Sequence, residues 1–165
     1  MLISYLTCFF AALLLHELGH LVAANACGVP APEFGLGWGR RLYSLKFKHV
    51  EYKLHALPIG AYVRLDMAEL QCRTISSQVL ILLAGVIFNL IAAAVSMGTP
   101  FGTINLLLAT TNILPLYQQD GWKCGMVMLR ALLRRKSSAV EWTFTIVGSG
   151  VSILLIAFQA LRHLN

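Results

Sequence analysis

Charged residues are scarce in this 165-residue chain, and acidic residues are scarcer still. Charged side chains make up 12% of the sequence against 58% hydrophobic residues, and only seven positions are Asp or Glu. Soluble domains carry about 25% charged residues. The composition therefore excludes an ordinary soluble domain, and several apolar runs approach the roughly 20 residues that cross a bilayer core. We predict a small multi-pass membrane protein that forms a single domain over residues 1–165.

The four cysteines lack the spacing of a thiolate site. No CxxC pair occurs among them, which argues against a disulfide framework and against a zinc site made of thiolates. Internal repeats and low-complexity tracts are missing too, so nothing marks a linker to a second domain. The net charge of +6 does not by itself indicate nucleic acid, because in a membrane protein the location of the basic residues matters more. We expect no nucleic-acid partner.

Apolar runs of helical length alternate with shorter polar connections. The first helix is predicted at about residues 2–27, before a Gly-Val-Pro terminator, and it lacks the basic start of a signal peptide. Further membrane helices are predicted at residues 77–97, 101–116 and 139–161. The basic, amphipathic segment at residues 121–136 is expected at the membrane surface.

The connection after the first helix has the pattern of strands. Between residues 33 and 67, apolar residues such as Tyr43, Leu45 and Phe47 alternate with polar ones, and a period of two is typical of β-structure. We predict a small sheet of two to four strands here. The fold class is therefore membrane α-helical, with about four transmembrane helices and a small β-sheet after the first.

Basic residues fall almost entirely in two connections, which sets the expected topology. Twelve of the thirteen lie between the first and second or between the third and last predicted helices, and Arg162 is the exception. By the positive-inside rule, both connections are cytoplasmic. We expect an integral, multi-pass protein of the bacterial cell membrane with both termini outside.

A cluster of ionisable residues interrupts the first apolar helix. His16, Glu17 and His20 form an HExxH motif, in which the two imidazoles lie one turn apart on one helix face and can bind one zinc ion. Glu17 lies beside that face and can act as a general base. Ionisable groups inside a membrane helix cost about 2.5–3.5 kcal/mol each, so they usually mark function. A buried His–Glu pair that only stabilises a bundle does not account for the second histidine.

A catalytic zinc ion has three protein ligands, so a third ligand is required. Asp120 follows an apolar stretch that Pro115 interrupts, and Gly121 allows the backbone to turn sharply after it. Such a broken helix end can bring a carboxylate to a site within the bilayer. An ordinary Asp-Gly turn accounts for the same residues equally well from spacing alone. Asp66 and Glu69 are the next candidates.

Four sequence elements, in order along the chain, resemble the site-2 protease family of intramembrane zinc metalloproteases. They are the HExxH motif, Pro-x-Gly-x-Tyr-Val at residues 58–63, Gly-x-x-x-Asn at residues 85–89 and Asn-x-x-Pro…Asp-Gly at residues 112–121. The chain looks like a minimal core of that family, with no PDZ insertion. Val86 and Trp122 depart from the family pattern, but neither replaces a ligand.

The resemblance implies roles that spacing alone does not give. It makes Asp120 the third zinc ligand and Asn89 a residue that holds the substrate carbonyl or its oxyanion. It also implies that the sheet dips into the membrane from the cytoplasmic side, close to the active site. For Asn89 the alternative is a simple interhelical hydrogen bond.

We therefore expect a zinc-dependent intramembrane endopeptidase, with Glu17 as base, that cleaves transmembrane segments in regulated intramembrane proteolysis. An exposed strand edge within residues 33–63 could hold the substrate extended. Besides substrate and the lipid bilayer, we expect a regulatory membrane partner. The alternative is a catalytically silent, metal-binding membrane adaptor or a transporter. A transporter needs polar residues along a path, whereas here they gather at one site.

Overall fold

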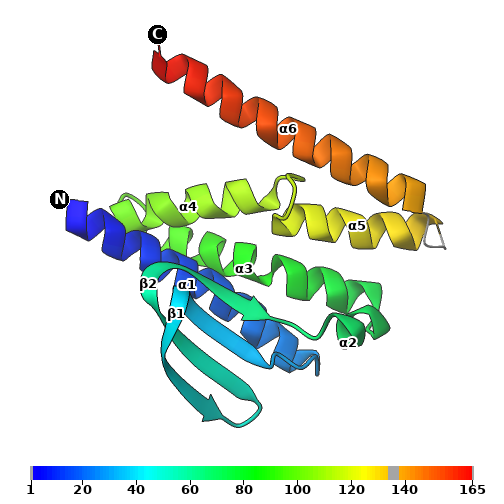
Figure 1. Cartoon of the computed structure of the whole chain (residues 1–165), viewed down its shortest axis with the longest axis horizontal. Helices are drawn as coiled ribbons and strands as arrows, with labels where there is room; N and C mark the ends of the chain where they lie inside the picture. The colour runs from blue at the N-terminus through cyan, green and yellow to red at the C-terminus, as the bar shows by residue number, and fades with distance from the viewer. Residues whose placement is uncertain (1, 134–137, 165) are drawn as a thin grey trace.

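The computed structural model describes residues 2–133 and 138–164 of the chain. Helices predominate, and one pair of strands follows the first helix (Figure 1). The elements in chain order are α1 (Leu2–Ala26), β1 (Glu33–Phe47), β2 (Val50–Arg64), α2 (Met67–Cys72), α3 (Ile75–Val95), α4 (Pro100–Ile113), α5 (Asp120–Leu133) and α6 (Ser138–Leu164). The predicted helices and the strand region therefore recur within a few residues of their expected bounds.

Helix α3 forms the centre of the bundle and contacts α1, α4 and α5. A cluster of buried apolar residues joins α3 to the end of α1 and to α2, with Ala24, Leu70 and Ile81 at most 1% exposed. Gly19 lets α1 and α3 approach closely, because a Cβ there would lie 2.7 Å from the carbonyl oxygen of Ala84. The face of α1 that carries the histidines is thereby pressed against α3.

Two of the described helices are long and apolar enough to cross a membrane, namely α1 with 25 residues and α3 with 21. Large apolar side chains on α3 point outward, with Ile91 58% and Val95 85% exposed, as a lipid-facing surface requires. Helix α4 has 14 residues, about 21 Å, which is shorter than the roughly 30 Å of a bilayer core. Four transmembrane helices therefore stay a prediction.

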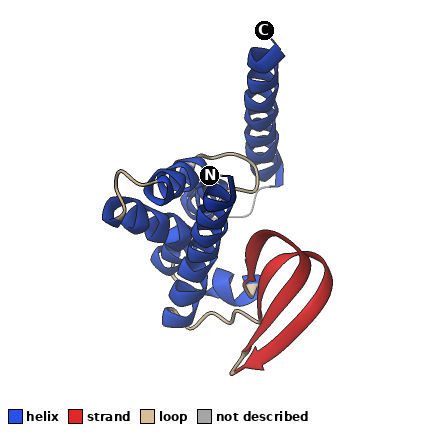
Figure 2. Ribbon diagram, turned by 90° about the vertical axis from the view of Figure 1, so that its left-hand side faces the viewer, coloured by secondary structure: helices blue, strands red, loops and turns tan. Residues whose placement is uncertain are grey.

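The strands β1 and β2 form a two-stranded antiparallel sheet, at the lower end of the predicted range. Both strands are bent, so that residues 33–36 are matched both to residues 51–54 and to residues 61–64. Phe34 and Val50 pack with Leu21 of α1 in a second buried cluster. Figure 2 shows the sheet on one flank of the helices, with its far end extending away from them.

Glu33 ties the inner part of the sheet together. The Lys53 ammonium lies 2.8 Å and the Arg64 guanidinium 3.4 Å from its carboxylate, and the Tyr62 hydroxyl donates to it. The hydrogen bonds from Lys53 and Tyr62 hold the pKa of Glu33 below its ordinary value. Burial and the bond to Glu33 raise the pKa of Tyr62 to about 12.

The short helix α2 was not expected, and Gly121 lies within helix α5 and not at the predicted sharp turn. Asp66, a candidate ligand, caps α2 by accepting hydrogen bonds from the backbone N–H groups of Ala68 and Glu69 at 3.0 and 3.1 Å. Helix α5 begins at Asp120 and covers the predicted surface segment as far as Leu133, and residues 134–136 lie outside the described part.

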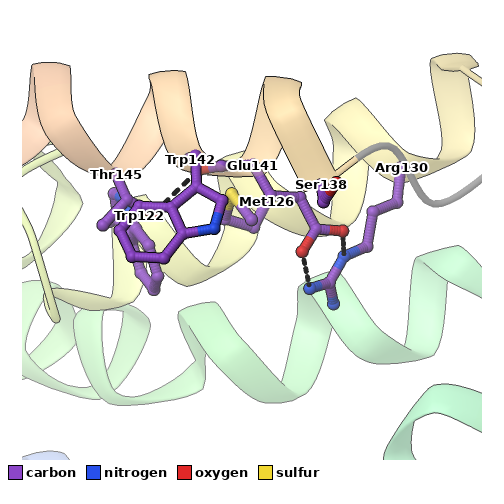
Figure 3. A pocket seen from close by; sticks show the side chains of 7 residues that line it. All are labelled: Trp122, Met126, Arg130, Ser138, Glu141, Trp142 and Thr145. Atoms are coloured by element: carbon purple, nitrogen blue, oxygen red, sulfur yellow. Dashed lines mark hydrogen bonds and ion pairs between the residues drawn. The ribbon is translucent and has the colours of Figure 1, made fainter.

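Helix α6 leads away from the bundle and is anchored at its start (Figure 1). The Arg130 guanidinium on α5 donates to both carboxylate oxygens of Glu141 on α6, at 2.8 and 3.0 Å (Figure 3). Two-point pairing of this kind fixes orientation as well as distance. The contact therefore ties α6 to the helix that begins at Asp120.

Candidate metal centre

His16, His20 and Asp120 meet in the interior, although 100 residues separate the aspartate from the nearer histidine. Oδ2 of Asp120 lies 2.9 Å from Nε2 of His16 and 3.1 Å from Nε2 of His20, and the two Nε2 atoms are 3.2 Å apart. All three residues are at most 5% exposed. The HExxH helix and the first residue of α5 thus converge on one point.

The three donor atoms fit a zinc ion. Bonds of about 2.0–2.1 Å at tetrahedral angles separate the ligand atoms by roughly 3.3 Å, and the observed separations are 2.9 to 3.2 Å. Two imidazoles and one carboxylate are a donor set found in catalytic zinc sites, which keep a fourth position open. Among the described residues this is also the one group of His, Cys, Asp and Glu side chains gathered closely enough to hold a metal ion.

The surroundings of His20 prepare its Nε2 atom for a metal. Nδ1 lies 2.7 Å from the carbonyl oxygen of Ile81 and can only donate to it, so the proton is on Nδ1 and Nε2 keeps its lone pair. Gly85 leaves the space that both imidazoles fill. A Cβ at Gly85 would lie 2.5 Å from Nε2 of His20 and 2.7 Å from Cε1 of His16. The glycine of the Gly-x-x-x-Asn element therefore has a steric role at this site.

Asn89 lies against the other ring nitrogen of His16, with its Nδ2 atom 3.2 Å from Nδ1. Asn89 is fully buried, and its Oδ1 has no hydrogen-bond partner among the described residues. A His16 that binds metal through Nε2 carries its proton on Nδ1 and needs an acceptor there. Turning the amide by 180° supplies Oδ1 as that acceptor, since the two amide orientations have the same shape.

Asp120 uses its two oxygens for different partners. Oδ2 faces the histidines, while Oδ1 accepts from the Lys123 ammonium at 3.0 Å. Lys123 lies one turn further along α5 and its side chain is 45% exposed. The lysine turns the carboxylate so that one oxygen points into the centre.

Glu17 extends from α1 towards the sheet. Its Oε2 accepts a hydrogen bond from the backbone N–H of Val63 at 3.0 Å. Val63 belongs to the Pro-x-Gly-x-Tyr-Val element near the end of β2. The motif that carries the histidines therefore also touches the edge of the sheet.

The remaining acidic residues lie away from this centre and have other partners. Glu51 lies 3.4 Å from the Lys53 ammonium, and Glu69, exposed on α2, lies 3.6 Å from Arg73. Glu33, Asp66 and Glu141 have the sheet, cap and helix contacts described above. Among the candidates raised by the sequence, Asp120 is the carboxylate beside the histidines.

Three contacts at the site were not anticipated from the sequence: those of Ile81 with His20, of Lys123 with Asp120 and of Val63 with Glu17. The Lys123 contact had a usable signal, because residues three apart on a helix face the same way. The other two depend on how α1 crosses α3 and β2. No spacing along the chain encodes them.

The geometry defines a class: a mostly helical protein with a buried HExxH motif and an aspartate placed together so that they could hold a metal ion. Residues 4–102 match the sequence model of peptidase family M50, and the chain belongs to that family. This confirms the site-2 protease resemblance. The matched region includes His16, His20 and Asn89, and Asp120 lies beyond it.

Relatives in bacteria carry matching names. A protein of Clostridium acetobutylicum, provisionally named a zinc metalloprotease, is 38% identical over 95 residues, which cover 53% of this chain and 28% of the relative. The zinc metalloprotease RasP of Geobacillus kaustophilus is 38% identical over 64 residues, 39% of this chain and 15% of the relative. The regulator of sigma-W protease RasP of Bacillus subtilis is 35% identical over 63 residues, which cover 38% of this chain and 15% of the relative. The chain matches less than a third of each of these relatives.

Family membership and the apolar helices identify an integral membrane protein of a metalloprotease family. Zinc is the metal in the relatives' names, and the group of two histidines and an aspartate is positioned to bind one.

Proposed function

We propose that this chain is the catalytic core of a zinc-dependent intramembrane endopeptidase that cleaves transmembrane segments of other membrane proteins. The observation that carries the proposal is the buried triangle of Nε2, Nε2 and Oδ2 atoms, 2.9 to 3.2 Å on a side, on an HExxH helix. His16, His20 and Asp120 are the proposed zinc ligands. When bound, zinc supplies a Lewis acid for water and for the substrate carbonyl.

Glu17 is the proposed general base. It follows His16 directly, so its side chain points about 100° away around the helix. This offset keeps the carboxylate beside the metal ligands without joining them. In that position it can take a proton from the attacking water and later deliver it to the leaving amine.

Two roles are proposed for Asn89. The role implied by the resemblance is catalytic, a hydrogen bond to the substrate carbonyl or its oxyanion. The contact with Nδ1 of His16, at 3.2 Å, supports a positioning role in which Asn89 orients that ligand. The two roles predict different defects when Asn89 is replaced.

The substrate is proposed to bind as an extended strand at the edge of β2. A transmembrane helix satisfies all its backbone hydrogen bonds internally, so a peptide bond must leave the helix before it can be attacked. A strand edge can take over those hydrogen bonds. The hydrogen bond from Val63 to Glu17 supports this location, because it puts the strand edge within contact of the base.

The membrane arrangement follows from the basic residues. We propose that the connections containing them are cytoplasmic and that both termini lie outside a bacterial membrane. The name of the Bacillus subtilis relative refers to a regulator of sigma-W. By analogy, a membrane-bound regulatory protein is the proposed kind of substrate, and a separate membrane protein is the proposed regulator.

The proposal is tested by cleavage of a single-span substrate by the purified chain in detergent. Glu17→Gln keeps the size of the side chain and loses the base, so zinc should be retained while cleavage falls about 10²–10⁴-fold. His16→Ala and Asp120→Asn should lose zinc together with activity, and a chelator should abolish wild-type cleavage. Near wild-type cleavage by Glu17→Gln, or by zinc-free protein, would refute the mechanism. A zinc-bound wild type that cleaves nothing would favour the adaptor alternative.

A further inference from the structure

An apolar pocket of about 330 Å³ lies between the first half of α1 and the sheet. This volume is at the lower end of the range of ligand sites, about 300–1,000 Å³. Residues at helical spacing line it from α1, and small residues line it from β2: Thr7, Phe10, Ala11 and Leu14, with Gly60 and Ala61. The walls are almost entirely apolar, so the pocket fits an apolar group.

The pocket is next to the candidate active site along the same two elements. Leu14, which lines it, precedes Glu17 by three residues, and Ala61, which lines it, precedes Val63 by two. Along α1, Glu17 lies about 4.5 Å beyond Leu14 and about 9 Å beyond Ala11. Along β2, Val63 lies about 6.6 Å beyond Ala61. Leu14 and Ala61 both line the pocket, and Glu17 and Val63 are hydrogen-bonded, so β2 runs beside α1 between these two points.

The backbone of Ala61 faces the same side. Residues 61–64 pair with residues 36–33 one by one, without a slip. Because the N–H of Val63 donates to Glu17, it is turned away from β1. Residues two apart along an antiparallel strand have the same orientation, so the N–H and C=O of Ala61 are also turned away from β1, towards α1.

A strand edge beside an apolar pocket indicates which occupant fits. Backbone N–H and C=O groups need hydrogen-bond partners, which an extended peptide has and a lipid chain lacks. A peptide paired with Ala61 would run on towards Glu17. Alternate side chains of such a strand point to the same face, so one of them can fill the pocket.

We propose that this pocket binds one apolar side chain of the substrate, two to three residues from the scissile bond, and so sets sequence preference. The spacing follows from the rise of about 6.6 Å from Ala61 to Val63 and of about 9 Å from Ala11 to Glu17, which equal two to three strand residues at about 3.3 Å each. The inference rests on the proposed function. Ala11 is the residue that determines the size of the accepted side chain, because a larger residue there fills the pocket from α1.

The test is a change of size preference. Single-span substrates carry Ala, Leu or Phe at each position within four residues of the cleavage site, and kcat/KM is measured with the full, zinc-loaded chain. The wild type should prefer Leu or Phe at one position, and Ala11→Phe should shift that preference towards Ala by about tenfold or more. Ala26→Phe, on the same helix at an exposed position outside the pocket, should change nothing. An unchanged preference in Ala11→Phe, even with a uniformly lower rate, would overturn the proposal and leave the pocket to lipid.

A second measurement does not depend on cleavage. Ala11→Cys is combined with Glu17→Gln, the four native cysteines are replaced by serine, and substrates carry one cysteine at successive positions. Disulfide crosslinking should peak at the substrate position that shows the size preference in the cleavage assay. If the wild type cleaves no substrate, crosslinking should still peak at a single position. Ala26→Cys should give no such peak. Crosslinks at no position, or equally at all positions, would refute the proposed binding of a side chain in the pocket. A clear peak without any cleavage by the wild type would count against the proposed protease chemistry alone.

Discussion

The metal centre and the sheet beside it are held in different ways. At the centre, His16, His20, Asp120 and Asn89 are at most 5% exposed, and helix packing fixes their positions. In the outer sheet, large apolar residues face outward, with Trp38 and Tyr43 each 61% exposed. The inner sheet is held by polar contacts around Glu33 and by the packing of Phe34 and Val50 against Leu21 of α1. The comparison indicates that helix packing fixes the centre in one geometry, whereas the outer sheet exposes apolar surface.

Among the described residues, one side-chain hydrogen bond, from the backbone N–H of Val63 to Glu17, joins the sheet to the helix that carries the histidines. Changes at the centre should therefore remove zinc. Changes in the sheet should leave zinc bound and alter how substrate is held.

Substitution of Gly85 should remove the metal altogether. The added methyl of Gly85→Ala would lie 2.5 Å from Nε2 of His20, so the imidazoles must move apart. Zinc per chain, measured by elemental analysis of purified protein, should fall close to zero along with cleavage. Gly150→Ala is the matched control, because a Cβ at this helical glycine meets nothing within 4 Å. Full zinc content in Gly85→Ala would mean that the centre tolerates changes of shape.

Truncation of Asn89 should separate positioning from catalysis. If Asn89 orients His16, Asn89→Ala should raise the dissociation constant for zinc about 10–100-fold, as loss of a partner behind a ligand does. Asn89→Asp, which keeps an acceptor facing Nδ1, should recover much of the affinity. If Asn89 instead holds the oxyanion, zinc affinity should be unchanged and kcat should fall about 10²–10³-fold.

The sequence was most informative where residue types are unusual for their surroundings. The HExxH motif in an apolar helix identified His16 and His20, and period-two alternation located the sheet. Asp120 was implied by the family resemblance, because the Asp-Gly pair after Pro115 fits an ordinary turn equally well. Sequence spacing could not supply contacts that depend on tertiary crossing, such as Ile81 with His20. It also left Asp66 open as a ligand, because a capping aspartate and a metal ligand look alike until the helix that follows is known.

In the sheet, loss of the Glu33 charge should loosen the structure, and the neutral variant Glu33→Gln allows this to be tested at a pH where zinc stays bound. The pKa of Glu33 is lowered in the fold, so its stabilising effect is complete above the unfolded value, about 4.3. It is lost as the pH falls through the lower, folded value. Glu33→Gln should reproduce the loss at neutral pH, at about 1.5–3 kcal/mol for charge-assisted hydrogen bonds.

Hydrogen exchange of peptides from residues 33–64 measures this effect. Exchange should be faster in Glu33→Gln than in the wild type at neutral pH, and acidification below about pH 4.3 should accelerate exchange less in this variant than in the wild type. Glu69→Gln, which removes an exposed carboxylate paired with Arg73 at 3.6 Å, is the control and should leave the sheet unaffected. Zinc loss in Glu33→Gln at neutral pH would show that the two regions are not separable.

The smallest effect is expected at Lys123, which contacts the centre from its solvent side. Its ammonium lies 3.0 Å from Oδ1 of Asp120, but the lysine side chain is 45% exposed, and exposed pairs contribute only about 0.2–1 kcal/mol. Lys123→Met should therefore raise the zinc dissociation constant less than tenfold, and Lys123→Arg should resemble the wild type. Competition with a zinc indicator dye measures both. Suppose that Lys123→Met lost as much zinc affinity as Asn89→Ala. The half-exposed Lys123 would then orient Asp120 as effectively as the fully buried Asn89 orients His16, and burial would not explain which residues around the ligands matter.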